Sequence, residues 1–180
     1  TTETGQRLDE KVMAFRAAGN NVTGVTVPRS GGGVGGLATN NFFHAGAWNE
    51  LRKMDFDSRL AALIDESMRQ KLVQDVKDST NLKEIMARTR NWYPMGLADR
   101  PRYTGSPDES LAAIAEAAGE HPVETWIRLT LESEGKMLFH LRGFNTNLDS
   151  LAEMISMEWA MPGLGDAGAH VSQMIDSGWT

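Results

Sequence analysis

The 180-residue sequence contains no cysteine, which excludes disulfide bonds and thiolate metal sites. It also lacks any apolar run near the roughly 20 residues that cross a bilayer. Its first twenty residues are polar and acidic, unlike a secretory signal peptide. These absences are compatible with the cytoplasm, which is the expected location, and they predict no membrane partner.

A basic patch is missing as well. The net charge is -6, and the lysines and arginines are scattered among acidic residues. Proteins that bind nucleic acid usually concentrate positive charge on one face, so we expect no nucleic-acid partner. The composition, 41% hydrophobic and 23% charged, is ordinary for a globular protein, and the length predicts a single domain over residues 1–180.

Helical and extended patterns alternate along the chain. Residues 4–18 predict an amphipathic helix with Leu8, Val12 and Phe15 on one face, and the β-branched run 22–27 predicts a strand. A helix followed by a short turn and a strand is typical of parallel α/β proteins. Further helices are predicted at 57–77 (with a possible break near Asp65), 82–90, 106–118, 122–133 and 147–155, and strands at 91–96, 137–141 and 157–161.

The run from Gly31 to Gly36 fits the spacing of the G-x-G-x-x-G dinucleotide fingerprint. That fingerprint requires a helix to begin at the glycines, so that its N-terminus faces the pyrophosphate. The residues that follow, 37–41, are poor helix formers. We therefore expect a loop, and nucleotide binding through these glycines is the weakest functional alternative.

One carboxylate and one imidazole lie close together within a stretch of small residues, from Met161 to His170. If residues 157–161 form a strand, Asp166 falls just past its carboxyl end, between Gly165 and Gly168. Catalytic side chains of α/β proteins lie at that end of the strands, although glycine and aspartate are also common in surface turns.

Two further residues are candidates for binding a substrate. His170 has two open roles, contacting substrate or Asp166 on the one hand and stabilising the loop on the other. Arg29 follows the first predicted strand and can pair with a substrate carboxylate through two hydrogen bonds. The other three histidines, His44, His121 and His140, have no zinc-ligand spacing, and structural roles are expected for His44 and His140.

The sequence resembles the D-aminoacylase branch of the amidohydrolase superfamily, the N-acyl-D-amino-acid deacylases. The resemblance covers nearly the whole chain and is most specific around Asp166. The residues that carry it are Phe42-Phe43, Trp48, Arg59 to Asp65, Ser110-Leu111-Ala112, Gly119 to Pro122, Glu134-Gly135, Phe144-Asn145 and Pro162 to His170. The strand ending Val27-Pro28-Arg29 also matches, although the family usually has Arg-Pro in that order.

The resemblance implies an α/β fold that is a partial (β/α)8 TIM-type barrel, with its last strands and a helix-rich insertion at about residues 42–134. It implies zinc as cofactor, with Asp166 at the metal centre. There Asp166 would exchange a proton with the metal-bound water that attacks the amide of a small-molecule substrate, an N-acyl-D-amino acid or a similar compound.

The sequence departs from the family in its metal ligands, because it has four histidines and no His-x-His pair. A zinc site needs about three protein ligands, so we expect the missing ones N-terminal to Thr1. The chain would then be a C-terminal fragment that alone binds no catalytic zinc and is inactive. A truncated barrel exposes apolar surface, which predicts self-association. The alternative is a non-catalytic helical interaction module.

Overall fold

The computed structural model describes residues 2–28, 31–39, 43–44, 46–97, 100–102 and 105–163. Its class is mixed α/β, as the sequence predicts, and the described strands form two small sheets without a closed barrel. The chain divides into two compact units, Thr1–Gly32 with Arg142–Thr180, and Gly33–Leu141. The expectation of one domain over the whole chain stays a prediction.

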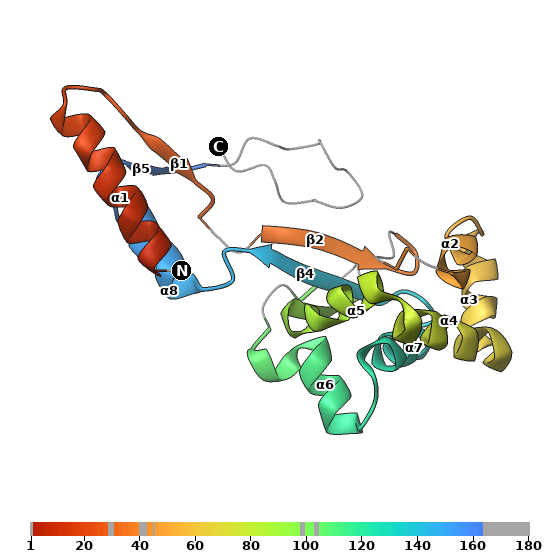
Figure 1. Cartoon of the computed structure of the whole chain (residues 1–180). Coiled ribbons are helices and arrows are strands. Elements are labelled where there is room, and N and C mark those ends of the chain that lie inside the picture. The colour runs from red at the N-terminus through yellow and green to blue at the C-terminus, as the bar shows by residue number, and fades with distance from the viewer. Residues whose placement is uncertain are drawn as a thin grey trace. The chain divides into compact units, whose positions relative to one another are not determined.

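The first unit contains two helix-strand pairs (Figure 1). Helix α1 (Thr2–Ala17) precedes strand β1 (Gly24–Thr26), and helix α8 (Leu148–Ile155) precedes strand β5 (Ala160–Pro162). The two strands pair in parallel, and α1 packs against α8. The strand that precedes Arg29 in the sequence and the strand that precedes Asp166 are therefore neighbours in one sheet.

Interactions far apart in sequence hold this unit together. The ring nitrogen of Trp159, which is buried, donates a hydrogen bond to Asp9 of α1 at 2.7 Å. Arg16 forms an ion pair with Glu158 at 3.2 Å. The predicted apolar face of α1 is only partly covered, because Val12 is buried whereas 60% of Phe15 is exposed.

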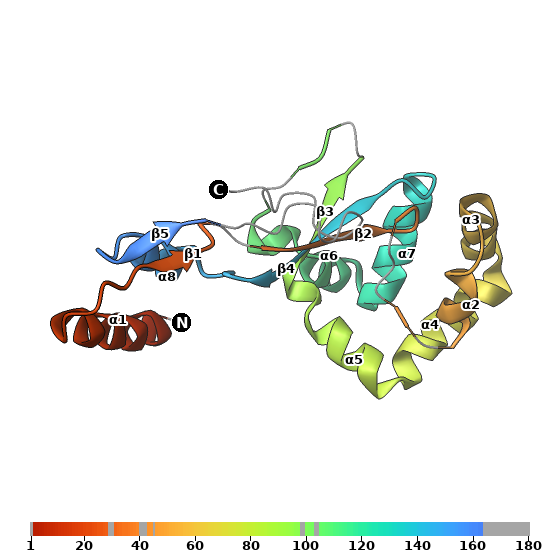
Figure 2. The ribbon, with the colours of Figure 1, turned by 90° about the horizontal axis from the view of Figure 1, so that it is seen from above.

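The second unit contains helices and most residues of a three-stranded sheet with the strand order β2-β4-β3, seen from above in Figure 2. Strand β4 (Leu138–Phe144) pairs antiparallel with β3 (Trp92–Gly96). Gly31 of β2 (Gly31–Gly36) lies against Phe144, and Gly36 lies against Met137, so β2 and β4 are also antiparallel. The helical elements are α2 (Ala47–Leu51), α3 (Phe56–Ile64), α4 (Glu66–Asp78), α5 (Thr80–Ala87), η1 (Thr89–Asn91), η2 (Pro107–Glu109), α6 (Leu111–Ala118) and α7 (Pro122–Glu132).

An aromatic cluster forms the core of the second unit. The rings of Phe43, Trp48 and Trp126 have centroids 4.3 to 5.7 Å apart, and Phe139 of β4 stacks on Trp126 at 5.6 Å. Trp48 also donates a hydrogen bond from its ring nitrogen to the carbonyl of Leu72 in α4, at 2.9 Å. The helices thus pack on the sheet through large rings whose polar atom is satisfied.

Two local expectations are corrected. The glycine run forms strand β2 rather than a loop, and turn residues rather than a helix follow it, which removes the geometry that the dinucleotide fingerprint requires. The helix predicted at 106–118 is divided in two: a capping box of Ser106 and Glu109 begins the single turn η2, and Ser110 caps helix α6 by accepting a hydrogen bond from Ala113. Among the described residues, no helix combines the length and apolar character that crossing a bilayer requires.

Candidate functional site

Strands β1 and β5 end together, at one edge of their sheet. Thr26 lies opposite Pro162, and the backbone N–H of Gly163 donates to the carbonyl of Thr26 at 2.9 Å. Arg29 comes three residues after Thr26 in the sequence, and Asp166 comes four residues after Pro162. The two segments that carry these candidates therefore leave the sheet from adjacent strands at the carboxyl edge, where α/β enzymes place their chemistry.

Arg29, Asp166 and His170 themselves lie outside the described residues. The structure therefore tests the strands that lead to them and leaves their side-chain roles as predictions. The described residues therefore give no distance between any two of these three side chains.

Asn145 is a residue at this edge that the site prediction omitted. Its side-chain amide donates a hydrogen bond to the carbonyl of Val27, 118 residues away, at 3.2 Å. Its backbone φ is 51°, a left-handed conformation that it shares, among non-glycine residues described, only with Glu134. Asparagine tolerates this conformation better than most residues, but the strand predicted at 137–141 ends four residues before Asn145, whereas β4 extends to Phe144.

Metal ligands do not gather among the described residues, where no three histidine or acidic side chains lie close enough to hold an ion. His121 caps helix α7 by accepting a hydrogen bond from Val123 at 3.3 Å, and His44 contacts the Arg52 side chain. His140 lies in β4 opposite Tyr93. His121 and His44 thus have structural contacts, and the described donor set does not fit zinc.

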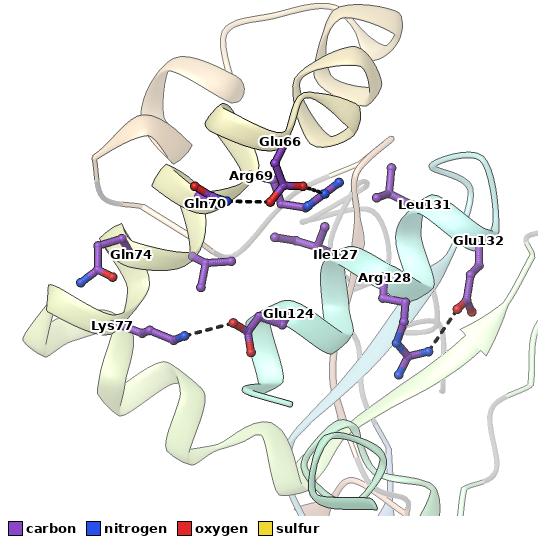
Figure 3. A pocket seen from close by; sticks show the side chains of 11 residues that line it. Glu66, Arg69, Gln70, Gln74, Lys77, Glu124, Ile127, Arg128, Leu131 and Glu132 are labelled. Carbon is purple, nitrogen blue, oxygen red and sulfur yellow. Dashed lines mark hydrogen bonds and ion pairs between the residues drawn. The ribbon is translucent and has the colours of Figure 1, made fainter. Parts of the chain in front are cut away.

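A groove lies in the second unit, between α4 and α7 (Figure 3). This groove has a volume of about 670 Å³, and apolar side chains of Val73, Ile127 and Leu131 line it together with charged residues. That volume lies within the range of small-molecule pockets, roughly 300 to 1,000 Å³. No sequence motif marked it, because its residues form an ordinary amphipathic pattern on each helix.

Charged side chains around the groove pair with one another. Lys77 of α4 reaches Glu124 of α7 at 3.0 Å, and Arg128 donates to Glu120 at 2.9 Å and to Glu132 at 3.1 Å (Figure 3 draws the Lys77 and Glu132 pairs). The hydrogen bonds with Glu120 and Glu132 raise the pKa of Arg128. The groove therefore presents apolar side chains to a ligand, and the charged side chains around it are paired with each other. It has no concentration of one charge that would bind an ionic ligand.

No protein-family model, curated protein or solved structure matches the chain.

Proposed function

We propose that the chain is the C-terminal part of a zinc-dependent amidohydrolase that cleaves the C–N amide bond of an N-acyl-D-amino acid or a similar small molecule. In this proposal β1 and β5 belong to the last strands of a (β/α)8 barrel, and residues 42–134 form a helix-rich insertion. The observation that supports it is the parallel register of β1 and β5, since the segments carrying Arg29 and Asp166 leave the sheet side by side. The resemblance around Asp166 supplies the reaction class.

Each candidate residue has a distinct role in this proposal. A carboxylate at position 166 takes a proton from the attacking water and returns it to the departing amine, which is ordinary general acid-base chemistry. Arg29 binds the carboxylate of the amino-acid portion through two parallel hydrogen bonds. His170 contacts the substrate or orients Asp166.

The donor set decides where a zinc ion would have to be held. Asp166 and His170 supply at most two ligands, and the described residues add no cluster. About three protein ligands are needed, so most of them would come from residues upstream of Thr1. We therefore assign the chain no metal-dependent step of its own.

The proposal is tested on the protein encoded by the complete reading frame, whose segment before Thr1 is expected to contain a His-x-His pair after a strand. Its hydrolysis of N-acetyl-D-amino acids is measured as release of the free amine. Asp166→Asn should lower kcat by about 10² to 10⁴, the usual contribution of a general base. Asp149→Asn, which changes an exposed carboxylate of α8 in the same unit, should leave the rate unchanged.

Two outcomes contradict this proposal. An upstream segment without His-x-His, in a protein that hydrolyses no N-acyl amino acid, removes the reaction class. A protein that hydrolyses them equally well with asparagine at position 166 removes the role of Asp166.

Self-association is part of the proposal. Val25 and Met161 lie opposite each other in the register of β1 and β5, and their side chains are 64% and 52% exposed. Parallel sheets normally have both faces covered, so this face favours contact with another copy of the isolated chain. Light scattering should show species larger than a monomer, and Val25→Thr with Met161→Gln should reduce them. A clean monomer before any substitution would rule this part out.

A non-catalytic helical interaction module is the second candidate function. The groove between α4 and α7 favours it, since an apolar base with balanced charges suits a partner's amphipathic helix better than an ionic metabolite. Val73→Glu, at a partly buried position of the groove, should then abolish capture of that partner while leaving hydrolysis by the complete protein unchanged. Hydrolysis and capture of a partner are thus tested with different variants.

A further inference from the structure

The floor of the groove between α4 and α7 is attached to the core of the second unit. Ile127 is buried within the large apolar cluster, and Val73 and Leu131 pack against that cluster. All three side chains line the groove. An apolar surface that is already held in place needs little ordering when a partner binds, so the groove is prepared for binding.

The walls of the groove are two helices, which limits the backbone conformation of a peptide that binds there. All of its lining residues lie within α4 and α7. An extended peptide would find no strand edge to pair with, and would leave its backbone N–H and C=O groups unpaired against apolar side chains. A helix satisfies its own backbone and presents only side chains, so a helix is the form of peptide that suits this groove.

The length of the groove sets the length of such a helix. The lining residues of α4 extend from Glu66 to Lys77, a stripe of about 17 Å at a rise of about 1.5 Å per residue. Lys77 pairs with Glu124 of α7 at one end, at 3.0 Å, and Glu66 and Leu131 lie towards the other end (Figure 3). A partner helix of about three turns matches this length.

The most exposed charged side chains along the groove are two carboxylates. Glu66, the first residue of α4, is 62% exposed, and Glu132, the last residue of α7, is 56% exposed. The cations that line the groove are 33% to 40% exposed, and each pairs with a carboxylate; they are Arg69, Lys77 and Arg128. A basic side chain on a partner therefore meets exposed carboxylates, whereas an acidic one meets cations that are paired and less exposed.

We infer that the groove binds the apolar face of a partner helix of about three turns that carries lysine or arginine at one end, and that Glu66 and Glu132 select this basic end. This partner rests on the second candidate function, the helical interaction module, and not on hydrolysis. Apolar contact with Val73 and Leu131 supplies affinity. The two carboxylates supply the choice between partners, because complementary charge contributes more to specificity than to affinity.

The selection is tested on the 180-residue chain with two synthetic helical peptides of about 14 residues, roughly four turns. Both are rich in alanine, with leucines at helical spacing on one face. A side-chain lactam bridge on the opposite face keeps each peptide helical, since short helices are only marginally stable in water. One peptide ends in two lysines and the other in two glutamates. Fluorescence anisotropy should show that the lysine peptide binds roughly 10-fold more tightly, as expected from exposed ion pairs.

Variants of the two carboxylates test their role directly. Glu66→Gln with Glu132→Gln keeps the size of both side chains, and the two peptides should then bind within about twofold of each other. Glu66→Lys with Glu132→Lys should reverse the preference. Glu84→Gln with Glu116→Gln is the matched control, because it removes two exposed carboxylates of α5 and α6 that lie outside the groove. This control should keep the full preference for the lysine peptide.

Several outcomes would overturn the inference. One is equal binding of the two peptides by the wild-type chain, and another is a preference that survives Glu66→Gln with Glu132→Gln. Binding of neither peptide would remove the helix site itself. Binding of the neutral dye Nile red, lost in Val73→Glu and without binding of either peptide, would identify a small-molecule site instead.

Failure of this inference is distinguishable from failure of the proposed functions. If both peptides bind equally and Val73→Glu abolishes both, the interaction module stands and the selection by Glu66 and Glu132 is wrong. If neither peptide binds, the groove no longer favours the interaction module, while hydrolysis is still decided by Asp166→Asn. Asp166→Asn should leave the Kd of the lysine peptide unchanged.

Discussion

Glu109 is a carboxylate whose acid-base behaviour follows from a few short contacts. It accepts hydrogen bonds from the backbone N–H of Ser106 at 2.9 Å, from Arg102, and from the Ser106 hydroxyl at 2.9 Å. These bonds favour the ionised form and lower the pKa of Glu109 from 4.5 to about 2. A group with a lowered folded-state pKa stabilises the protein above its unfolded pKa and loses that contribution as the pH falls.

We therefore predict a defined pH window for Glu109→Gln. The variant should be less stable than the wild type above pH 4.5, and the difference should shrink as the pH falls from 4.5 towards about 2. Urea unfolding at a series of pH values measures it. Asp108→Asn, which removes the neighbouring exposed charge, is the control, and a difference for Glu109→Gln that stays constant across this window would contradict the prediction.

Gly24 of β1 allows the Trp159 ring to approach the strand. A Cβ at position 24 would lie 2.4 Å from the ring, and the ring is buried and tied to Asp9. We predict that Gly24→Ala lowers the free energy of unfolding by about 1 to 3 kcal/mol, the usual cost of overpacking. Gly143→Ala should cost little, because its Cβ would meet only atoms 3.9 Å away. Equal melting temperatures for the two variants would refute this.

Among elements, helix α7 has a histidine at its N-cap. Burial first, and the positive charge of Lys77 second, lower the pKa of His121, although Glu124 acts in the opposite direction. The folded state thus prefers neutral His121, which can accept the hydrogen bond from Val123. Stability from this group is complete above the unfolded pKa of about 6.5 and declines as the pH falls below it.

The lowered pKa of His121 predicts how the stability of His121→Asn depends on pH. Asparagine is a strong N-cap and does not titrate, so the variant should lose less stability than the wild type between pH 6.5 and 5. Thermal unfolding followed by circular dichroism measures both slopes. His44→Asn is a comparison variant, since burial and the charge of Arg52 also lower the pKa of His44, and it should reduce the slope independently of the α7 cap. A wild-type slope that survives His121→Asn unchanged would show that other groups titrate in this window.

Elements with local signals were predictable from the sequence. Asp65 interrupts the long helical pattern because its side chain caps α4 by accepting a hydrogen bond from Met68, and Asn147 caps α8 in the same manner through Ser150. The strand formed by Gly31 to Gly36 was not predictable, because glycine has little intrinsic preference for strands. That strand exists through its pairing with β4, which is tertiary information.

At the scale of the whole molecule, the pairing of β1 with β5 joins segments more than 130 residues apart in sequence. Composition and periodicity predict each strand but not its neighbour, so the edge that β1 and β5 share follows only from the observed register. The Asn145 contact with Val27 depends on the same long-range closure. The groove between α4 and α7 was likewise not predictable, because residues of both helices line it and the sequence does not show that the two helices are neighbours.

The division into two units leads to a prediction about the chain as a whole. Every residue of the large buried cluster lies between Leu37 and Phe139, inside the unit Gly33–Leu141. A core contained in one continuous segment should support folding of that segment without the rest of the chain. Residues 33–141 produced alone should therefore unfold cooperatively and keep the near-ultraviolet circular dichroism of packed tryptophans.

Trp126→Ala in the isolated segment is the matched test of that core. Trp126 is buried and its ring contacts those of Phe43, Trp48 and Phe139, so its truncation should cost about 3 to 5 kcal/mol. A loss of that size should abolish cooperative unfolding in a segment of this length, because small domains are only marginally stable. If the wild-type segment already unfolds without a cooperative transition, the second unit requires the first for its fold, and the two units form one folding domain.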